Sequence, residues 1–424
     1  MSWETVKLGD CCVKIGSGAT PKGGATVYIE TGTALIRSQN VYNLAFDYQG
    51  LTYITEDATK KLNGVTVHEK DVLLNITGDS VARVCMVPNN VLPARVNQHV
   101  AILRTNGNLL SEYLLYYLAS PHMQAYMLNL AVGKGASRSA LTKGMIEDFP
   151  LLLPSVEEQK NIVKYLSAYD DLVKNNQKQI KLLEEAAQRL YKEWFVDLRF
   201  TEYENTPIID GVPQGWERLP LGELIEYEIG GGWGEDQPTE KSELPAYVIR
   251  GTDLYDVTHG NAKSIPYRFH AKSNLDSRKL QDGDIVFEVS GGSKNEGVAR
   301  TALITESLLD FLGGYVICAS FCKLIRFKDK SLAKYMYDTF QYLRNSGETV
   351  KYDKRSASSI VNYRWKDFLE QQLVFVPTDD VLKGYNALAE NMQKAIVNKA
   401  QIIERAKQAR DRLLPKLMSG ELEV

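Results

Sequence analysis

Two long segments of the chain carry apolar residues at steps that alternate between four and three. A period of 3.5 residues is typical of a coiled-coil seam. In the first segment, Ser155 and Glu158 predict a capping box at the start of a helix, and Pro154 blocks an upstream extension. The predicted seam of this helix contains Ile162, Leu166, Tyr169, Val173, Asn176, Ile180, Leu183, Ala187, Leu190 and Trp194.

The same pattern returns 223 residues later, and its seam contains Tyr385, Ala389, Met392, Ile396, Lys399, Ile403, Ala406, Arg410, Leu413 and Leu417. Asn176 and Lys399 occupy the same heptad position, where a polar residue lowers stability and can fix the register and the partner. We therefore predict that the two helices pair with each other as an antiparallel coiled coil. The alternative is that each helix packs separately on its own domain.

The regions that precede the two helices also repeat. Three pairs of motifs keep an offset of 213 residues: Trp-Glu-x-x-x-Leu-Gly at 3–9 and 216–222, Ile-Arg at 36–37 and 249–250, and a strand-like run at 71–78 and 284–291. Because the offset grows to 223 in the helices, the second copy carries about ten extra residues, which loops accommodate at little cost. The chain therefore contains two copies of one plan, a globular region followed by a long helix.

Each globular region is predicted to be mixed α/β with strands dominant. Residues 111–128 predict a helix opened by Ser111, and its counterpart follows Ser331 and stops at Gly347. The predicted fold class is α+β: two similar mixed α/β domains joined by a long antiparallel two-helix coiled coil, with a pseudo-twofold internal repeat. The predicted boundaries are 1–154 for the first globular domain, 155–200 for the central helical spacer, 201–377 for a linker and the second globular domain, and 378–424 for the C-terminal helical spacer.

Composition and charge narrow the class of protein. The net charge of −3 does not suggest a uniformly basic nucleic-acid binder, although a local basic face is compatible with it. No apolar run approaches the length of a membrane span, and the N-terminus lacks the pattern of a secretory signal, so we expect a cytoplasmic protein. The five cysteines form no CxxC pair and the histidines no HExxH motif, so neither disulfides nor a metal site is expected.

Polar and basic residues gather in loops and after predicted strands. The loops 133–144 and 346–359 suit contacts with phosphates and base edges. Residues 37–40 follow a strand and include side chains that can read guanine or adenine through two hydrogen bonds, whereas 250–253 carry a different set. The alternative is that the loops are ordinary solvated loops and that the residues after the strands make stabilising hydrogen bonds. The candidate DNA-binding residues are Arg37, Gln39, Asn40, Thr77, Lys134, Arg138, Arg250, Asp253, Ser290, Lys294, Lys351, Lys354 and Arg355.

The sequence contains no recognisable catalytic motif. It lacks the GxxxxGK[ST] phosphate loop, GxGxxG, and the Asn/Asp-Pro-Pro-aromatic sequence of amino-methyltransferases. Glu-x-Lys, half of a common nuclease site, occurs only at Glu158–Lys160, where helix capping explains the glutamate better. We therefore assign no catalytic residue.

Three stretches resemble a known family. Residues 153–195 resemble the central region of the specificity subunits of type I restriction-modification systems. Residues 211–224 resemble the opening of the second target recognition domain of these subunits, and residues 402–424 are similar to their C-terminal region. The resemblance covers essentially the whole chain, including its two-copy plan, and is weakest inside the globular domains.

The resemblance implies a DNA-recognition and scaffold subunit without catalysis of its own. Each recognition domain would read one half of a split double-stranded DNA target, and the paired helices would set the gap and dock two methyltransferase subunits. Those subunits would bind S-adenosylmethionine and methylate an adenine in each half-site, and motor-nuclease subunits can join them. Arg410 at a seam position departs from an apolar pattern. The open alternatives are a nuclease or methyltransferase with degenerate motifs, and a coiled-coil structural protein without a DNA role.

Overall fold

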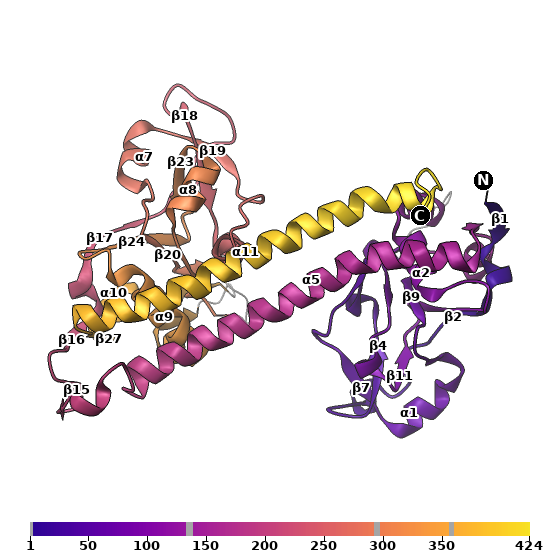
Figure 1. Ribbon diagram of the computed structural model, residues 1–424, viewed down its shortest axis with the longest axis horizontal. Helices are drawn as coiled ribbons and strands as arrows, with labels where there is room; N and C mark the ends of the chain where they lie inside the picture. Colours follow the sequence, from indigo (N-terminus) through magenta and orange to yellow (C-terminus); the bar gives the residue numbers. More distant parts are fainter. Residues whose placement is uncertain (1–2, 133–138, 292–296, 356–359) are drawn as a thin grey trace. The chain divides into compact units, whose positions relative to one another are not determined.

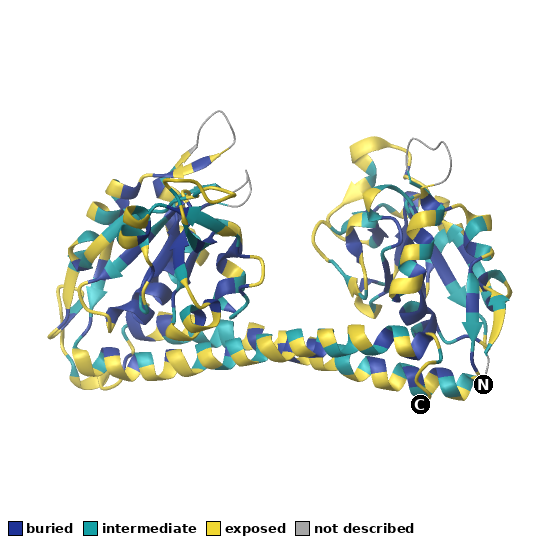
Figure 2. Cartoon of the chain, turned by 90° about the horizontal axis from the view of Figure 1, so that it is seen from above, coloured by how far each residue is buried: buried dark blue, intermediate teal, exposed yellow. Residues whose placement is uncertain are grey.

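The computed structural model describes residues 3–132, 139–291, 297–355 and 360–424 (Figure 1). The chain divides into two compact units. The first unit contains Met1–Leu172 and Arg405–Val424, and the second contains Val173–Glu404. Each unit contains a globular domain and one end of each of two long helices. Figure 2 shows that the buried residues of each unit concentrate in its sheets and in the helices packed on them.

Two sheets form the centre of the first unit. The antiparallel sheet has the order β10 (Val84–Met86), β9 (Val72–Asn75), β12 (Val100–Thr105) and β2 (Cys12–Ser17). The other has the order β3 (Tyr28–Ile29), β7 (Thr52–Ile54), β4 (Thr33–Ile36), β11 (Ala94–Val96) and β8 (Thr66–Val67). Two short pairs complete the strands: β1 (Glu4–Lys7) with β13 (Pro150–Leu153), and β5 (Val41–Tyr42) with β6 (Ala45–Phe46).

The helices of the first globular domain are α1 (Glu56–Lys61), α2 (Ser111–Ala119), α3 (Pro121–Ala131) and α4 (Lys143–Glu147). The prediction of one helix over 111–128 was wrong, because the chain forms two helices there. Pro121 cannot donate a hydrogen bond to the preceding turn, and the Ser120 hydroxyl instead accepts from the Met123 amide at 3.4 Å to cap α3. The counterpart in the second copy contains no proline and forms the single helix α9 (Leu332–Asn345).

The second unit repeats this plan. One sheet has the order β17 (Ile225–Gly230), β24 (Cys322–Phe327), β20 (Ile285–Glu288) and β22 (Thr301–Leu303), and another β19 (Tyr267–His270), β18 (Leu244–Ile249) and β23 (Tyr315–Cys318). A third has the order β21 (Ser290–Gly291), β26 (Val361–Tyr363) and β25 (Asp353–Arg355), and two pairs are β14 (Ile208–Ile209) with β15 (Val212–Pro213) and β16 (Glu217–Pro220) with β27 (Leu373–Val376). Its other helices are α6 (Leu254–Thr258), α7 (Lys272–Arg278), α8 (Glu306–Leu312) and α10 (Trp365–Gln371).

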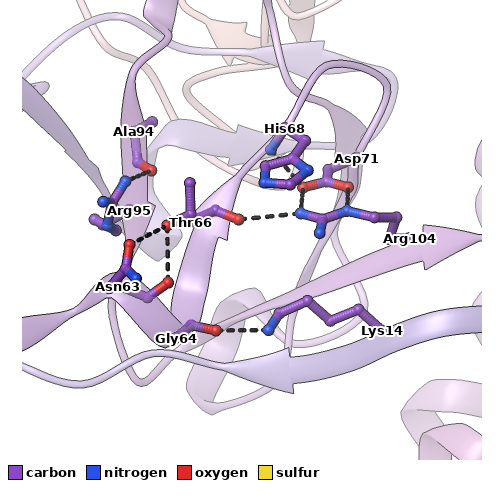
Figure 3. A network of polar contacts seen from close by, with 9 residues as sticks. All are labelled: Lys14, Asn63, Gly64, Thr66, His68, Asp71, Ala94, Arg95 and Arg104. Carbon is purple, nitrogen blue, oxygen red and sulfur yellow. Dashed lines mark hydrogen bonds and ion pairs between the residues drawn. The ribbon is translucent and has the colours of Figure 1, made fainter.

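A buried ion pair at the same place in both units confirms the internal repeat. In the first unit, the Arg104 guanidinium donates to both carboxylate oxygens of Asp71, at 2.8 and 2.7 Å, and to the Thr66 carbonyl at 3.0 Å (Figure 3). In the second unit, Arg326 donates to both oxygens of Asp284, at 2.8 Å each. Both aspartates are almost fully buried, and a buried charge of this kind requires its partner.

The two long helices are α5 (Val156–Tyr191), continued by a π-helical turn at Lys192–Val196, and α11 (Asp379–Met418). The predicted capping box opens α5: the Glu158 carboxylate accepts from the Ser155 amide at 2.9 Å, and the Ser155 hydroxyl accepts from the Glu158 amide at 3.3 Å. Both helices begin one residue after the predicted boundaries of the spacers. The compact units nevertheless cut through both helices, so the boundaries of the predicted domains stay a prediction.

Each unit on its own shows that the helices run antiparallel. In the first unit, the start of α5, with Ile162 and Leu166, shares one core with Leu414 and Leu417 at the end of α11. In the second unit, Tyr191 at the end of α5 and Trp194 in the π-helical turn that follows share a core with Leu382, Tyr385 and Ala389 at the start of α11. The predicted fold class is therefore confirmed. Within the described residues, no helix is both long and apolar enough to cross a membrane.

Candidate nucleic-acid interface

Three strand ends meet along one edge of the first unit. β4 and β11 are parallel with Ile36 beside Val96, so the segments that follow them leave the sheet side by side. The Asn97 amide donates to the Ile36 carbonyl at 3.0 Å, which holds these segments together. Asn75 lies at the end of β9, and its side-chain amide donates to the Ser38 carbonyl at 2.8 Å. We call this edge, formed by 37–40, 76–78 and 97–99, the strand-end edge of the first unit.

Arg37 and Gln39 lie on this edge beside the loop that contains Gly50. The Arg37 guanidinium donates to the Gly50 carbonyl at 2.6 Å, and the exposed Gln39 amide donates to the same oxygen at 3.3 Å. A carbonyl shared by two donors leaves each side chain with further hydrogens, because a guanidinium has five and a primary amide two. Both side chains therefore keep donors that a base or a phosphate could accept.

Asn40 is fully buried, so its side chain has no surface to offer to DNA. Its carbonyl accepts from the Arg37 amide at 3.0 Å, and its amide donates to the Asp47 carbonyl at 2.9 Å. These bonds shape the turn that follows β4. Its burial removes Asn40 from the side chains that we propose as DNA contacts, and the alternative of a stabilising hydrogen bond describes its position better.

The second unit has the same turn with a different chemistry. Asp253 is 2% exposed and accepts from the Arg250 amide at 2.9 Å, as Asn40 does from Arg37. The Arg250 guanidinium also donates to both Asp253 oxygens, at 2.9 and 2.7 Å, and to the Ser264 carbonyl at 3.0 Å. The hydrogen bond with Asp253 raises the pKa of Arg250, although partial burial opposes this. Asp253 is therefore a positioning group for Arg250, which keeps a partly exposed side chain.

Ser290 and Lys354 come together on the three-stranded sheet of the second unit. Asn362 in the central strand pairs with Ser290 on one side and with Lys354 on the other. The Ser290 hydroxyl donates to the Asn362 side-chain carbonyl at 2.8 Å. Lys354 is exposed, and the exposed Lys351 ammonium lies 5.0 Å from the centre of the Tyr352 ring.

The remaining candidates fall at or beyond the limits of the described structure. Arg355 ends β25, where its backbone is described and its side chain is not. Lys134, Arg138 and Lys294 lie outside the described residues. Their contact with DNA stays a prediction.

Thr77 belongs to a chain of four polar side chains on the strand-end edge of the first unit. Its hydroxyl lies 2.5 Å from Nδ1 of His99, and Nε2 of His99 lies 3.0 Å from the Gln98 amide nitrogen. The Thr20 hydroxyl donates to the Gln98 carbonyl at 2.5 Å. The geometry therefore adds Thr20, Gln98 and His99 to the candidate residues.

A model of the type I restriction modification DNA specificity domain matches residues 1–185, which contain the first globular domain and most of α5. Residues 1–185 therefore carry a type I restriction modification DNA specificity domain. The type I restriction enzyme MjaIX specificity subunit of Methanocaldococcus jannaschii is 24% identical, over 100% of this chain and 94% of that protein. The putative MjaX specificity subunit of the same organism is 23% identical over 54% of this chain and 53% of that protein.

A solved structure shows the same fold. The S subunit of the type I restriction-modification system of M. genitalium matches with a TM-score of 0.56 and 12% sequence identity, covering 98% of this chain and 96% of that one. Members of the specificity family serve DNA recognition, and the chain shares their domain and their fold. The relatives are named specificity subunits, so the recognition role predicted from the sequence is confirmed at this level.

The candidate helix-pairing residues of α5 and α11 are buried or partly buried, and their pairing across the helices stays a prediction. None of these side chains is exposed; they are Ile162, Leu166, Tyr169, Val173, Asn176, Ile180, Leu183, Leu190, Met392, Ile396, Lys399, Ile403 and Leu413. In the second unit the Lys399 ammonium donates to the Gln179 side-chain carbonyl. A polar seam position therefore has a partner on the opposite helix.

Arg410 has a partner that the sequence pattern did not reveal. In the first unit its guanidinium donates to Asp170 of α5 at 2.5 Å, and the Tyr116 hydroxyl donates to the other Asp170 oxygen at 2.5 Å. Burial lowers the pKa of Arg410, but the hydrogen bonds and charges of Asp170 and Asp411 outweigh burial and raise it. Arg410 thus joins both helices to the globular domain, and its polar character is compatible with helix contacts in the last heptads of α11.

Proposed function

We propose that this chain is a non-catalytic DNA-recognition subunit in which the first unit reads one half of a bipartite target and the second unit reads the other half. One observation carries the proposal: the same scaffold is present twice, with different side chains at equivalent strand ends. Asn40 and Asp253 accept from the backbone at the same position of the same turn, but Gln39 of the first copy corresponds to Thr252 of the second. The turn keeps the same backbone hydrogen bond in both units while a neighbouring side chain differs. This arrangement suits two domains that recognise different DNA sequences.

The proposed contacts are polar side chains that remain accessible. Arg37, Gln39 and Thr77 would face DNA in the first unit, and Arg250, Ser290, Lys351 and Lys354 in the second. Arginine and glutamine can each make two hydrogen bonds to a base edge, whereas lysine suits phosphates. Because the net charge is −3, we propose that partner subunits supply part of the cationic surface that phosphate binding requires.

We propose that α5 and α11 act as a spacer and as the docking surface for two methyltransferase subunits. The helices contain 36 and 40 residues. At about 1.5 Å per residue, each would extend roughly 50 to 60 Å. Exposed apolar side chains along them include Tyr165 in the first unit and Leu182 and Leu388 in the second, and such residues suit a partner helix. The methyltransferase subunits would bind S-adenosylmethionine. Motor-nuclease subunits can join the assembly that they form with this chain.

Exchanging one globular domain tests the division of labour. Residues 1–154 would be replaced with the first domain of another specificity-family member, and the chain would be assembled with its methyltransferase subunits. We expect one half-site to change while the other half and the gap stay the same, because the second unit retains all of its own strand-end residues. Sequencing of methylated DNA gives the target.

The reciprocal exchange of residues 212–377 is the matched control, and it should change only the other half-site. A change in both halves after either exchange would contradict independent reading. An unchanged target after both exchanges would place recognition outside the two globular domains.

A further inference from the structure

The turn between β11 and β12 presents an exposed amide at the strand-end edge of the first unit. Gln98 stands in the middle of this turn, directly after the parallel pair of β4 and β11. Hydrogen bonds hold both of its neighbours. The Asn97 backbone amide donates to the Ile36 carbonyl, and the His99 backbone amide donates to the Asn97 side-chain carbonyl at 3.0 Å. The backbone that carries Gln98 is therefore fixed on both sides.

The side chain of Gln98 is also oriented. The Thr20 hydroxyl donates to its carbonyl oxygen at 2.5 Å, and its amide nitrogen lies 3.0 Å from Nε2 of His99. Because a neutral imidazole carries one hydrogen, accepting from Gln98 at Nε2 leaves that hydrogen on Nδ1. Nδ1 can then donate to the Thr77 hydroxyl, which lies 2.5 Å away. The chain of bonds from Thr20 to Thr77 sets which end of the amide is the donor.

A glycine makes this arrangement possible. A β-carbon at Gly18 would lie 1.7 Å from the carbonyl oxygen of Val96, so only glycine allows the loop to approach the end of β11. The Gly18 amide donates to the Asn97 carbonyl at 3.1 Å. This contact brings Thr20, two residues later, within reach of Gln98. The side chain is thereby ordered before it meets a ligand, which reduces the entropy cost of binding.

The network leaves the amide with a definite pair of free groups. A primary amide has two hydrogens and two lone pairs, and Thr20 and His99 use one of each. One N–H donor and one carbonyl lone pair remain on an exposed side chain. In the major groove, adenine presents an acceptor at N7 and a donor at N6, which match this pair, whereas guanine presents two acceptors. The free groups of Gln98 therefore complement adenine.

The second unit repeats the support but not the amide. A β-carbon at Gly231 would lie 2.2 Å from the carbonyl oxygens of Cys318 and Ala319, so a glycine again approaches the end of the parallel strand. The turn that follows carries Ser320 and Phe321, and Phe321 is 56% exposed. In both units a glycine supports the turn after the parallel strand, but the turn displays hydrogen-bonding groups in one unit and an aromatic ring in the other. Such a difference suits a position that selects bases.

We infer that Gln98 reads an adenine, other than the methylated one, in the half-site of the first unit, and that Thr20 and His99 position its amide. This inference rests on the proposed function. Replacing Gln98 with alanine should lower the affinity of the assembled complex for its own target by about 10- to 100-fold. It should also relax the choice of base at the position that Gln98 contacts. The second half-site should keep its sequence.

The test uses the full chain assembled with its methyltransferase subunits and target duplexes in which each adenine of the first half-site is replaced in turn with 7-deazaadenine. The wild-type complex should lose about 5- to 50-fold in affinity at one position, because the N7 acceptor is gone, while Gln98→Ala should be insensitive there. Thr20→Val should fall in between, because it removes a positioning bond and leaves the amide. Gln371→Ala, at an exposed glutamine of α10, is the matched control and should behave as wild type.

The outcomes separate this inference from the proposed function. A wild-type complex without a bipartite target would overturn the proposed function itself. A bipartite target whose first half-site specifies no second adenine, or equal sensitivity of wild type and Gln98→Ala to every 7-deazaadenine substitution, would overturn the role of Gln98 and leave the proposed function standing.

Discussion

Lengthening both long helices by one heptad is expected to widen the unread gap of the DNA target by about three base pairs. The insertions belong between Leu172 and Val173 in α5 and between Glu404 and Arg405 in α11, where the chain passes from one compact unit to the other. Copies of 166–172 and 398–404 preserve the seam. Seven residues add about 10 Å of helix, which corresponds to roughly three base pairs of B-form DNA.

Both half-sites should stay readable, because neither globular domain is altered. Three base pairs also rotate one half-site by about a third of a turn, so we expect weaker binding as well as a wider gap. Sequencing of the methylated DNA measures the gap. The control is an insertion in α5 alone, which shifts one helix against the other and should abolish target methylation. If the double insertion gave the original gap, the helices would not set the spacing.

Replacing Leu417 with alanine is expected to destabilise the first unit by about 2–5 kcal/mol and to leave the second unit intact. Leu417 is fully buried near the end of α11 and belongs to the core of the first globular domain, together with Ile162 and Leu166 from the start of α5. Removing most of its side chain leaves a cavity at the point where both helices meet this domain. For a unit of this size, the midpoint of its thermal unfolding should fall by roughly 4 to 20 °C.

Hydrogen exchange measured segment by segment checks this prediction, since it reports the two units separately. Faster exchange should appear in β9, β12 and α2 and not in β20, β24 or α9. Leu422→Ala provides the matched control, because Leu422 is 41% exposed and its truncation should change stability little. Unchanged exchange in the Leu417→Ala variant would mean that the end of α11 does not help to hold the first domain together.

The helices could be predicted from the sequence because their signals are local. The sequence alone shows the 3.5-residue period, the capping box at Ser155 and the offset between the two copies. The break between α2 and α3 was also legible in the Ser120–Pro121 pair, but the apolar pattern that continues across it favoured one helix. Arg410 was ambiguous, because its partner Asp170 comes from the other helix and depends on the register of pairing.

The candidate interface was harder to predict, because it depends on contacts between distant segments. Gln98 and His99 come just after an apolar strand, but only the parallel pairing of β4 with β11 brings the segment that carries them next to the segment that begins at Arg37. Asn40 and Asp253 have suitable chemistry for base contacts, and only their burial shows that they shape the turn instead. Residue type indicated the right strand ends, while the direction of each side chain required the fold.

Methylated adenines should be mapped in the genome of the source organism, with and without this gene, to test whether the two units read two separated half-sites. We expect one bipartite motif that disappears with the gene, with two specified halves separated by a gap of constant length and unspecified sequence. A continuous motif, or two halves separated by a variable gap, would contradict the claim that two readers are held apart by paired helices.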